Sequence, residues 1–98
     1  MVILKTNNYT NFSVKYLLEV PRLDLIFCSA RDSEGKLHLF LIFNERGKIY
    51  VRKGLNSTWI EVTDENDYFQ VRGLLKSALD QGVPYFTNNR FSLQGITG

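Results

Sequence analysis

The sequence predicts an α+β domain in which an antiparallel β-meander of four to five strands is followed by one amphipathic helix. Three observations predict this fold. Residues 37–44, LHLFLIFN, form a short apolar run between two turn signals, as is typical of a buried strand. Residues 48–53 and 58–63 alternate between apolar and polar side chains, which favours two more strands. Residues 65–81 carry apolar side chains at helical spacing.

The composition is that of one soluble globular domain spanning residues 1–98, with 44% hydrophobic and 22% charged residues. The apolar runs are far shorter than the roughly 20 residues that cross a bilayer. The first residues, MVILKTNN, lack a charged n-region and are too short for the apolar part of a signal peptide. The single cysteine, Cys28, cannot form an internal disulfide. We therefore expect a cytoplasmic protein that does not associate with membranes.

The beginning of the chain is the most ambiguous part of the sequence. Residues 2–6, VILKT, have the composition of a short strand. Residues 12–20 alternate as a strand does, but Leu17 interrupts the polar face. Leu17 also fits helical spacing together with Val14 and Leu18. We favour a strand over 12–20, with a helix as the alternative.

The next two strands are expected at residues 24–31 and 37–44, joined by a loop that contains Gly35. The second of them is apolar at nearly every position. One face carries Leu37, Leu39, Leu41 and Phe43, and the other carries His38, Phe40 and Ile42. A half-solvated antiparallel strand should show a polar face. Both sides of this sheet must therefore be covered.

Two further strands are expected at residues 48–53 and 58–63, with a turn at Gly54 between them. Their alternation predicts which side chains share a face. The inward set is Ile49, Val51, Ile60 and Val62. The outward set is Lys48, Tyr50, Arg52, Trp59 and Glu61.

The helix expected at about 65–81 has clear end signals. Asp64 is a good N-cap, and Glu65 and Asp67 suit the positive end of the helix dipole. Gly82 follows the last turn, as is common after a helix. The apolar stripe consists of Tyr68, Val71, Leu74, Leu75, Ala78 and Leu79. A stripe of this width predicts that the helix covers one face of the sheet.

Two residues of this helix do not fit the pattern. Phe69 points away from the stripe, on the side of Arg72 and Lys76. Gly73 lies on the exposed side, where glycine costs roughly 1 kcal/mol relative to alanine. Either Phe69 folds back over the helix start and Gly73 has no role, or another chain approaches this side closely.

The tail, residues 84–98, is short and rich in apolar side chains. It carries Tyr85, Phe86, Phe91, Leu93 and Ile96. Asn88 and Asn89 tolerate left-handed conformations, which suits a small hairpin of 85–87 with 90–93. The tail would then either cover the second face of the sheet or extend its edge.

The sequence gives no support to a catalytic function. Cys28 and His38 are the only cysteine and histidine, and pairing Cys28 opposite Phe40 would place them diagonally on one face. Among apolar neighbours, however, a cysteine behaves as a small hydrophobic residue. No motif supplies zinc ligands, an EF-hand or a phosphate-binding glycine loop. We expect a protein that is not an enzyme, with no metal, no cofactor and no small-molecule substrate.

The function that the pattern favours is a non-catalytic protein-interaction module. It would be a homo-oligomer or a small regulatory or inhibitor-type protein that docks on a larger protein. The argument is surplus apolar surface, because one helix covers only one face and a layered domain must bury the other. The opposing interpretation is that the chain's own ends close that face.

The alternative function is nucleic-acid binding through a basic and aromatic strand face around residues 46–59. Cations on phosphates and aromatic rings under bases form a platform for single strands. Two observations argue against nucleic-acid binding: the net charge is only +2, and Glu61 lies on the same face. The candidate binding residues for either function are Arg46, Lys48, Tyr50, Arg52, Trp59, Phe69 and Arg72.

Overall fold

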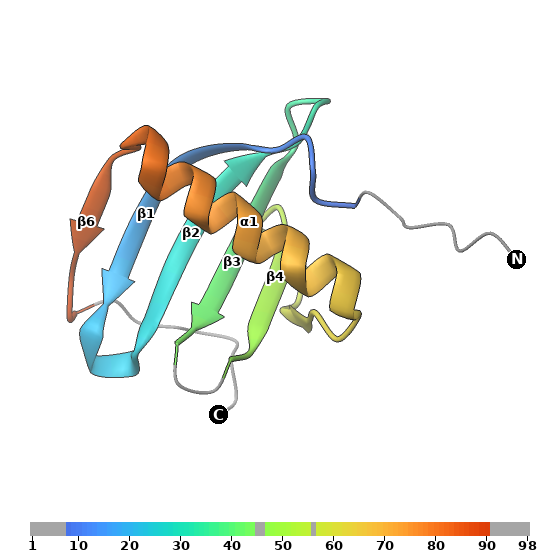
Figure 1. Cartoon of the computed structure of the whole chain (residues 1–98). Helices are drawn as coiled ribbons and strands as arrows, with labels where there is room; N and C mark the ends of the chain where they lie inside the picture. Colours follow the sequence, from blue (N-terminus) through green and yellow to red (C-terminus); the bar gives the residue numbers. More distant parts are fainter. Residues whose placement is uncertain (1–7, 45–46, 56, 91–98) are drawn as a thin grey trace, which may run out of the picture.

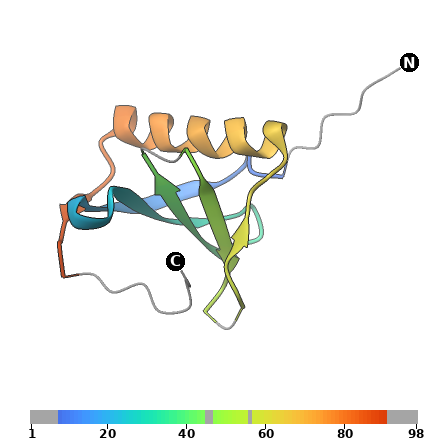
Figure 2. The ribbon, with the colours of Figure 1, turned by 90° about the horizontal axis from the view of Figure 1, so that it is seen from below.

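The structure, a computed structural model, describes residues 8–44, 47–55 and 57–90. One helix packs on one face of a six-stranded sheet with strand order β5-β4-β3-β2-β1-β6 (Figures 1 and 2). The predicted α+β fold is confirmed, with a slightly higher strand count than the four to five expected. No helix in these ranges is long and apolar enough to cross a membrane.

The central strands follow the chain as an antiparallel meander, and the last strand departs from it. The elements are β1 (Ser13–Val20), a 3-10 turn η1 (Pro21–Leu23), β2 (Leu25–Arg31), β3 (Leu37–Phe43), β4 (Ile49–Lys53), β5 (Ile60–Glu61), α1 (Glu65–Gln81) and β6 (Tyr85–Thr87). Strands β1 to β5 pair antiparallel in order, and β6 pairs in parallel with β1. The strand expected at 2–6 lies outside the described residues.

Of the predicted stretch 12–20, residues Ser13–Val20 form a strand, and a β-bulge explains their irregular pattern. The register of β1 against β2 shifts between Val14 and Tyr16. After the bulge, Leu17 lies opposite Cys28 and is buried on the side of the helix, while Tyr16 packs on the other side. The extra residue changes the alternation, so the apparent break at Leu17 belongs to a continuous strand.

Helix α1 begins and ends as its sequence predicts. The side chain of Asp64 accepts a hydrogen bond from the backbone N–H of Asp67 at 3.0 Å. Gly82 follows the helix with a φ of 72°, a left-handed conformation that glycine adopts easily. Of the predicted stripe, Val71, Leu75 and Ala78 are buried. Leu79, at the margin of that stripe, remains 49% exposed.

The core consists of two clusters, one on each face of the sheet. The face under α1, called the helix-side face, holds Leu17, Ile26, Cys28, Ala30, Phe40, Ile42, Ile49, Val51, Val62, Val71, Leu75 and Ala78. The opposite face, called the second face, holds Val20, Leu25, Phe27, Leu39 and Leu41. Residues 38–42, the centre of the run 37–44, are therefore buried on both faces of the sheet, as the apolar composition predicts.

One sequence prediction at the sheet edges needs correction, and another is confirmed. Ile60, expected to point inward, is 63% exposed, because β5 comprises only Ile60–Glu61 of the expected strand 58–63 and lies at the sheet edge. Residues 85–87 extend the edge of the sheet beside β1, one of the two positions predicted for the tail, while their hairpin with 90–93 depends on residues outside the described part. Helix α1 returns the chain across the sheet, so β6 runs in the same direction as β1 (Figure 1). Residues 91–93 lie outside the described part.

Candidate functional site

The second face presents a row of partly buried apolar and aromatic side chains. They pack on the second-face cluster and are Tyr16, Leu18, Leu23, Leu37, Phe43, Tyr50 and Trp59. Phe86 of β6 joins them, because it pairs with Leu18 and its ring lies 6.2 Å from that of Tyr16 while it remains 54% exposed. Helix α1 lies on the opposite side of the sheet (Figure 2). Among the described elements, no helix covers this face.

Aromatic contacts divide the second face into two groups. The rings of Tyr16 and Phe27 stack with their centroids 6.2 Å apart. At the other side of the sheet, Phe43 meets Tyr50 edge-on at 5.9 Å. Aromatic pairs of this kind contribute more than their buried area alone and hold the rings in fixed orientations. The second face is therefore a pre-organised surface and not a set of loose side chains.

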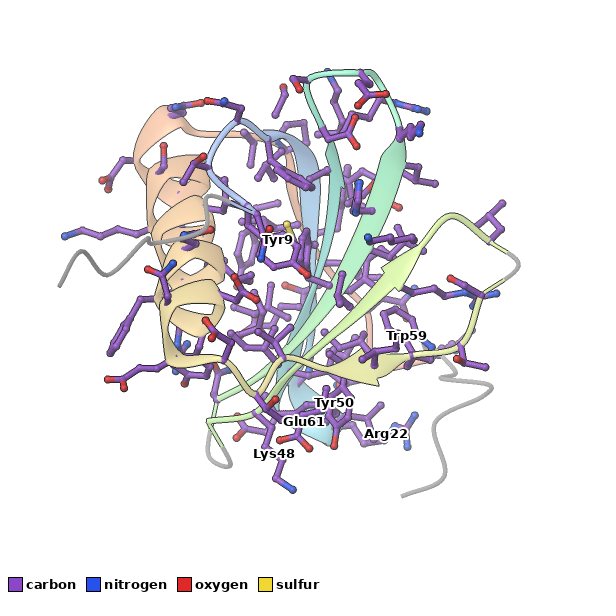
Figure 3. All side chains as sticks on the ribbon, turned by 90° about the vertical axis from the view of Figure 1, so that its right-hand side faces the viewer. Tyr9, Arg22, Lys48, Tyr50, Trp59 and Glu61 are labelled. Atoms are coloured by element: carbon purple, nitrogen blue, oxygen red, sulfur yellow. The ribbon has the colours of Figure 1, made fainter. Side chains whose placement is uncertain are left out.

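The predicted residues of β4 lie on this face. Tyr50 is the register partner of Leu41 on one side and Glu61 on the other, and Arg52 is the partner of Leu39. Figure 3 shows Lys48, Tyr50 and Glu61 at the same end of the sheet. The alternation of residues 48–53 thus correctly predicts which of these side chains share a face.

Arg52 is less available to bind a phosphate than the sequence suggests. Its guanidinium lies 5.8 Å from the centre of the Trp59 ring. It also donates a hydrogen bond to the carbonyl oxygen of Leu55. These contacts hold Trp59 against the β4–β5 hairpin. They also engage the guanidinium group to which a phosphate would have to bind. Arg52 therefore acts first as a positioning residue for Trp59.

The other predicted residues are not part of the same surface. Phe69 is 62% exposed on the outer side of α1, with its ring edge-on to Tyr68 at 5.9 Å. Arg72 lies with its guanidinium 5.5 Å from the centre of the Tyr68 ring. Since α1 covers the helix-side face, these residues and the second face lie on opposite sides of the molecule. Arg46 lies outside the described residues.

Cys28 and His38 do not form a nucleophilic pair. The predicted register is confirmed, with Cys28 opposite Phe40. Burial raises the pKa of the Cys28 thiol to about 12, so the reactive thiolate is scarce at neutral pH. The imidazole of His38 is committed elsewhere, with its Nε2 2.9 Å from Oδ2 of Asp32.

Sequence reasoning missed the pair formed by Asp32 and His38. Oδ1 of Asp32 accepts the backbone N–H groups of Glu34 and Lys36, each at 2.9 Å, and so holds the β2–β3 turn. The hydrogen bond from His38 and these two N–H groups keep the pKa of Asp32 below its ordinary value. Because the Asp32 carboxylate is an acceptor, Nε2 of His38 donates the hydrogen bond between them. Nδ1 of His38 is buried and has no hydrogen-bond partner in the described part of the chain.

Comparison with protein-family models, with curated proteins and with solved structures gave no match to this chain. Within the described ranges, no three histidine, cysteine, aspartate or glutamate side chains gather so that they could hold a metal ion. The function of the chain must therefore be inferred from its geometry, and the second face is an apolar surface that no described helix covers.

Proposed function

We propose that this protein is a non-catalytic interaction module that self-associates by packing its second face against that of another copy. The observation that carries the proposal is the second face itself: an apolar, aromatic sheet surface without a covering helix among the described elements. Two-layer domains commonly bury such a surface against a second sheet.

The residue types on this face favour a protein partner. Trp59 and Tyr50 belong to the types that contribute most binding energy at interfaces. The two are half-buried and already fixed by neighbours, Trp59 by Arg52 and Tyr50 by Phe43. Little side-chain freedom would be lost when they meet a partner, which lowers the cost of association.

The charges on this face favour a second copy of the same chain. Lys48 and Glu61 lie at one end of the second face, and Glu61 is the register neighbour of Tyr50. A two-fold symmetric contact brings the same patch of both copies together. Opposite charges within one patch then allow Lys48 of one protomer to meet Glu61 of the other, so the patch complements itself.

The size of the face sets the expected strength. Six strands at a spacing of about 4.8 Å span about 24 Å across the sheet. The central strands reach about 20 Å along their length, so the face has a projected area of roughly 500 Å². A standard interface buries about 800 Å² per partner. Since rough side-chain surface exceeds its projection, nearly the whole face is needed. We expect a dimer of micromolar rather than nanomolar affinity.

Analytical ultracentrifugation over a wide concentration range tests this proposal. The wild-type chain should pass from monomer to dimer. Tyr50→Ala and Trp59→Ala should each weaken dimerisation by about tenfold or more. Phe69→Ala is the matched control, because it removes an exposed aromatic ring from the other side of the molecule, and it should leave the dimer unchanged.

Two outcomes contradict the proposal. A chain that stays monomeric up to millimolar concentration has no self-complementary face. A dimer that Phe69→Ala dissociates while Tyr50→Ala does not would place the contact on the outer side of α1 and remove the second face from it.

Nucleic-acid binding is the second candidate, because Lys48, Tyr50 and Arg52 alternate on the second face. Arg52 is engaged with Trp59 and Leu55, and Glu61 adjoins Tyr50, so the face offers a phosphate few free cations. A gel-shift series with a single-stranded oligonucleotide at two salt concentrations separates the two functions. A shift that weakens with salt and is lost in Lys48→Ala would favour nucleic acid.

A further inference from the structure

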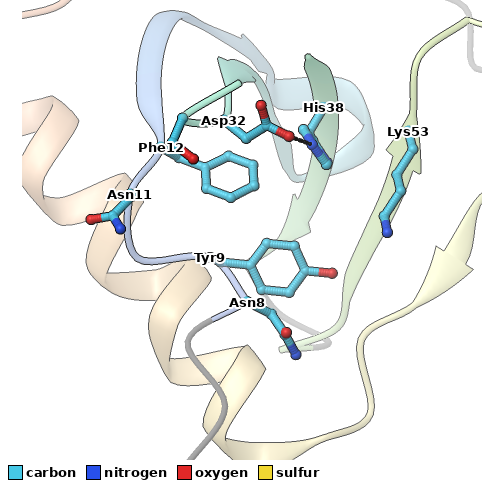
Figure 4. A pocket seen from close by; sticks show the side chains of 8 residues that line it. Asn8, Tyr9, Asn11, Phe12, Asp32, His38 and Lys53 are labelled. Carbon is cyan, nitrogen blue, oxygen red and sulfur yellow. Dashed lines mark hydrogen bonds and ion pairs between the residues drawn. The ribbon is translucent and has the colours of Figure 1, made fainter. Parts of the chain in front are cut away.

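A pocket lies on the helix-side face, away from the proposed dimer surface. It has a volume of about 410 Å³ and lies between the turn of residues 8–12 and the strands β3 and β4 (Figure 4). A volume of this order is typical of sites for small molecules. Its walls differ in chemistry, with aromatic rings on one side and polar groups on the other.

The aromatic wall consists of Tyr9 and Phe12, and the buried side chain of Phe40 supports both rings. Their ring centroids are 5.6 Å apart, and they lie 5.5 Å and 6.0 Å from the ring of the buried Phe40. The backbone N–H of Tyr9 donates to Oε1 of Gln70 on α1 at 2.9 Å. This wall is therefore formed before any ligand arrives.

The polar wall carries one negative charge, at Asp32, and one positive charge, at Lys53, with the ring of His38 between them. His38 is 6% exposed and lies opposite Lys53 in the register of β3 and β4, so both side chains share the helix-side face. Figure 4 shows Asp32 and Lys53 on either side of His38, with the rings of Phe12 and Tyr9 nearby. Nδ1 of His38 is buried and has no hydrogen-bond partner among the described residues, so a ligand in the pocket would meet the face of the ring and not this nitrogen.

This arrangement matches a ligand that carries both charges. An anion would be attracted by Lys53 and repelled by Asp32, and a cation would meet the reverse. A molecule with an ammonium and a carboxylate on the same carbon satisfies both groups. Its carboxylate would face Lys53, its ammonium would face Asp32, and its apolar part would contact Phe12 and Tyr9.

We propose that this pocket binds a free α-amino acid with an apolar side chain. The site is independent of the proposed dimer, because Tyr50 and Trp59 lie on the other face of the sheet. The lining residues supply no activated nucleophile, so the site would bind its ligand without converting it.

Heteronuclear NMR titration with L-phenylalanine as the probe tests the site. Signals of Tyr9, Phe12, His38 and Lys53 should shift and saturate, while those of Tyr50 and Trp59 should not.

Two relatives of the probe separate the charges. N-acetyl-L-phenylalanine lacks the ammonium and L-phenylalaninamide lacks the carboxylate, and each should bind about tenfold more weakly than L-phenylalanine. Lys53→Met should weaken binding of L-phenylalanine but not of L-phenylalaninamide, which has already lost the group that faces Lys53. Lys76→Met, an exposed lysine on α1, is the matched control and should change neither.

The proposal is overturned if L-phenylalanine gives no saturable shift at these four residues up to its solubility limit. It is also overturned if the three compounds bind equally, because apolar contact alone would then explain the binding. Lys53 is exposed, so Lys53→Met should fold normally and its result bears on binding.

Discussion

The two faces of the sheet contain similar side chains but differ in what lies over them. Phe40 and Leu41 are neighbours in β3, point to opposite faces and are both fully buried. Phe40 is enclosed by α1 and by Tyr9 and Phe12 of the N-terminal turn. Leu41 lies beneath half-buried neighbours that include Tyr50. The difference shows that alternation decides which face a residue joins, and that distant segments decide how the face is closed.

The largest expected effect is on the helix-side face. Phe40→Ala should lower the free energy of unfolding by about 3–5 kcal/mol, because it opens a cavity between α1 and the sheet. Urea denaturation measures this change. Phe43→Ala, at the half-buried end of the same strand and on the second face, is the matched control and should cost clearly less. Equal losses would mean that both faces are closed equally well.

A smaller effect is expected at the start of the covering helix. Asp64→Ala removes the side chain that accepts from the backbone N–H of Asp67 and should lower the free energy of unfolding by about 1 kcal/mol. Thermal unfolding followed by circular dichroism would detect it. Asp80→Ala is the control, since an acid near the negative end of the helix does not stabilise it. A loss as large in Asp80→Ala would contradict the capping role.

Gly73→Ala should act in the opposite direction and stabilise the covering helix. Apart from its own helix backbone and adjacent residues, no atom of the described chain lies within 4 Å of the position that its Cβ would occupy, so alanine should raise the free energy of unfolding by about 0.5–1 kcal/mol. Sedimentation of the same variant should show an unchanged dimer. If the variant is more stable but no longer associates, another copy approaches the outer side of α1 and the glycine is required there.

The weakest effect concerns the β2–β3 turn and depends on pH. The pKa of Asp32 is lowered in the folded state by His38 and by the N–H groups of Lys36 and Glu34. The ionised carboxylate therefore stabilises the fold above its unfolded pKa of about 4, and this contribution is lost as the pH falls through the lower folded value. Urea unfolding at successive acidic pH values should show a smaller decline in Asp32→Asn than in the wild type. Parallel curves would show that Asp32 does not contribute.

Local signals predicted the helix and the central strands correctly. Asp64 and Gly82 mark the helix ends because capping depends on the residues beside them. The pairing of Cys28 with Phe40 follows from the loop that joins their strands. The parallel pairing of β6 could not be predicted in this way, because it depends on where α1 returns the chain.

For the candidate sites too, local patterns were predicted correctly, whereas contacts between distant segments were not. Alternation correctly placed Lys48, Tyr50 and Arg52 on one face. It could not reveal that Arg52 lies over Trp59. The pocket around His38 was also missed, because it forms only where Tyr9, which is far from β3 in the sequence, packs against that strand.

The bulge in β1 affects which deletions this strand can tolerate. Val14, before the bulge, and Leu17, after it, are three positions apart but both face the helix side, because the extra residue Lys15 shifts the alternation between them. Deleting Lys15 would leave Val14 and Leu17 two positions apart, so a regular strand would keep both on the helix-side face. Loss of this exposed residue should therefore be tolerated, as length variation is in the turns, whereas a deletion after the bulge, where β1 pairs with β2 in unbroken register, would turn part of the strand toward the wrong face.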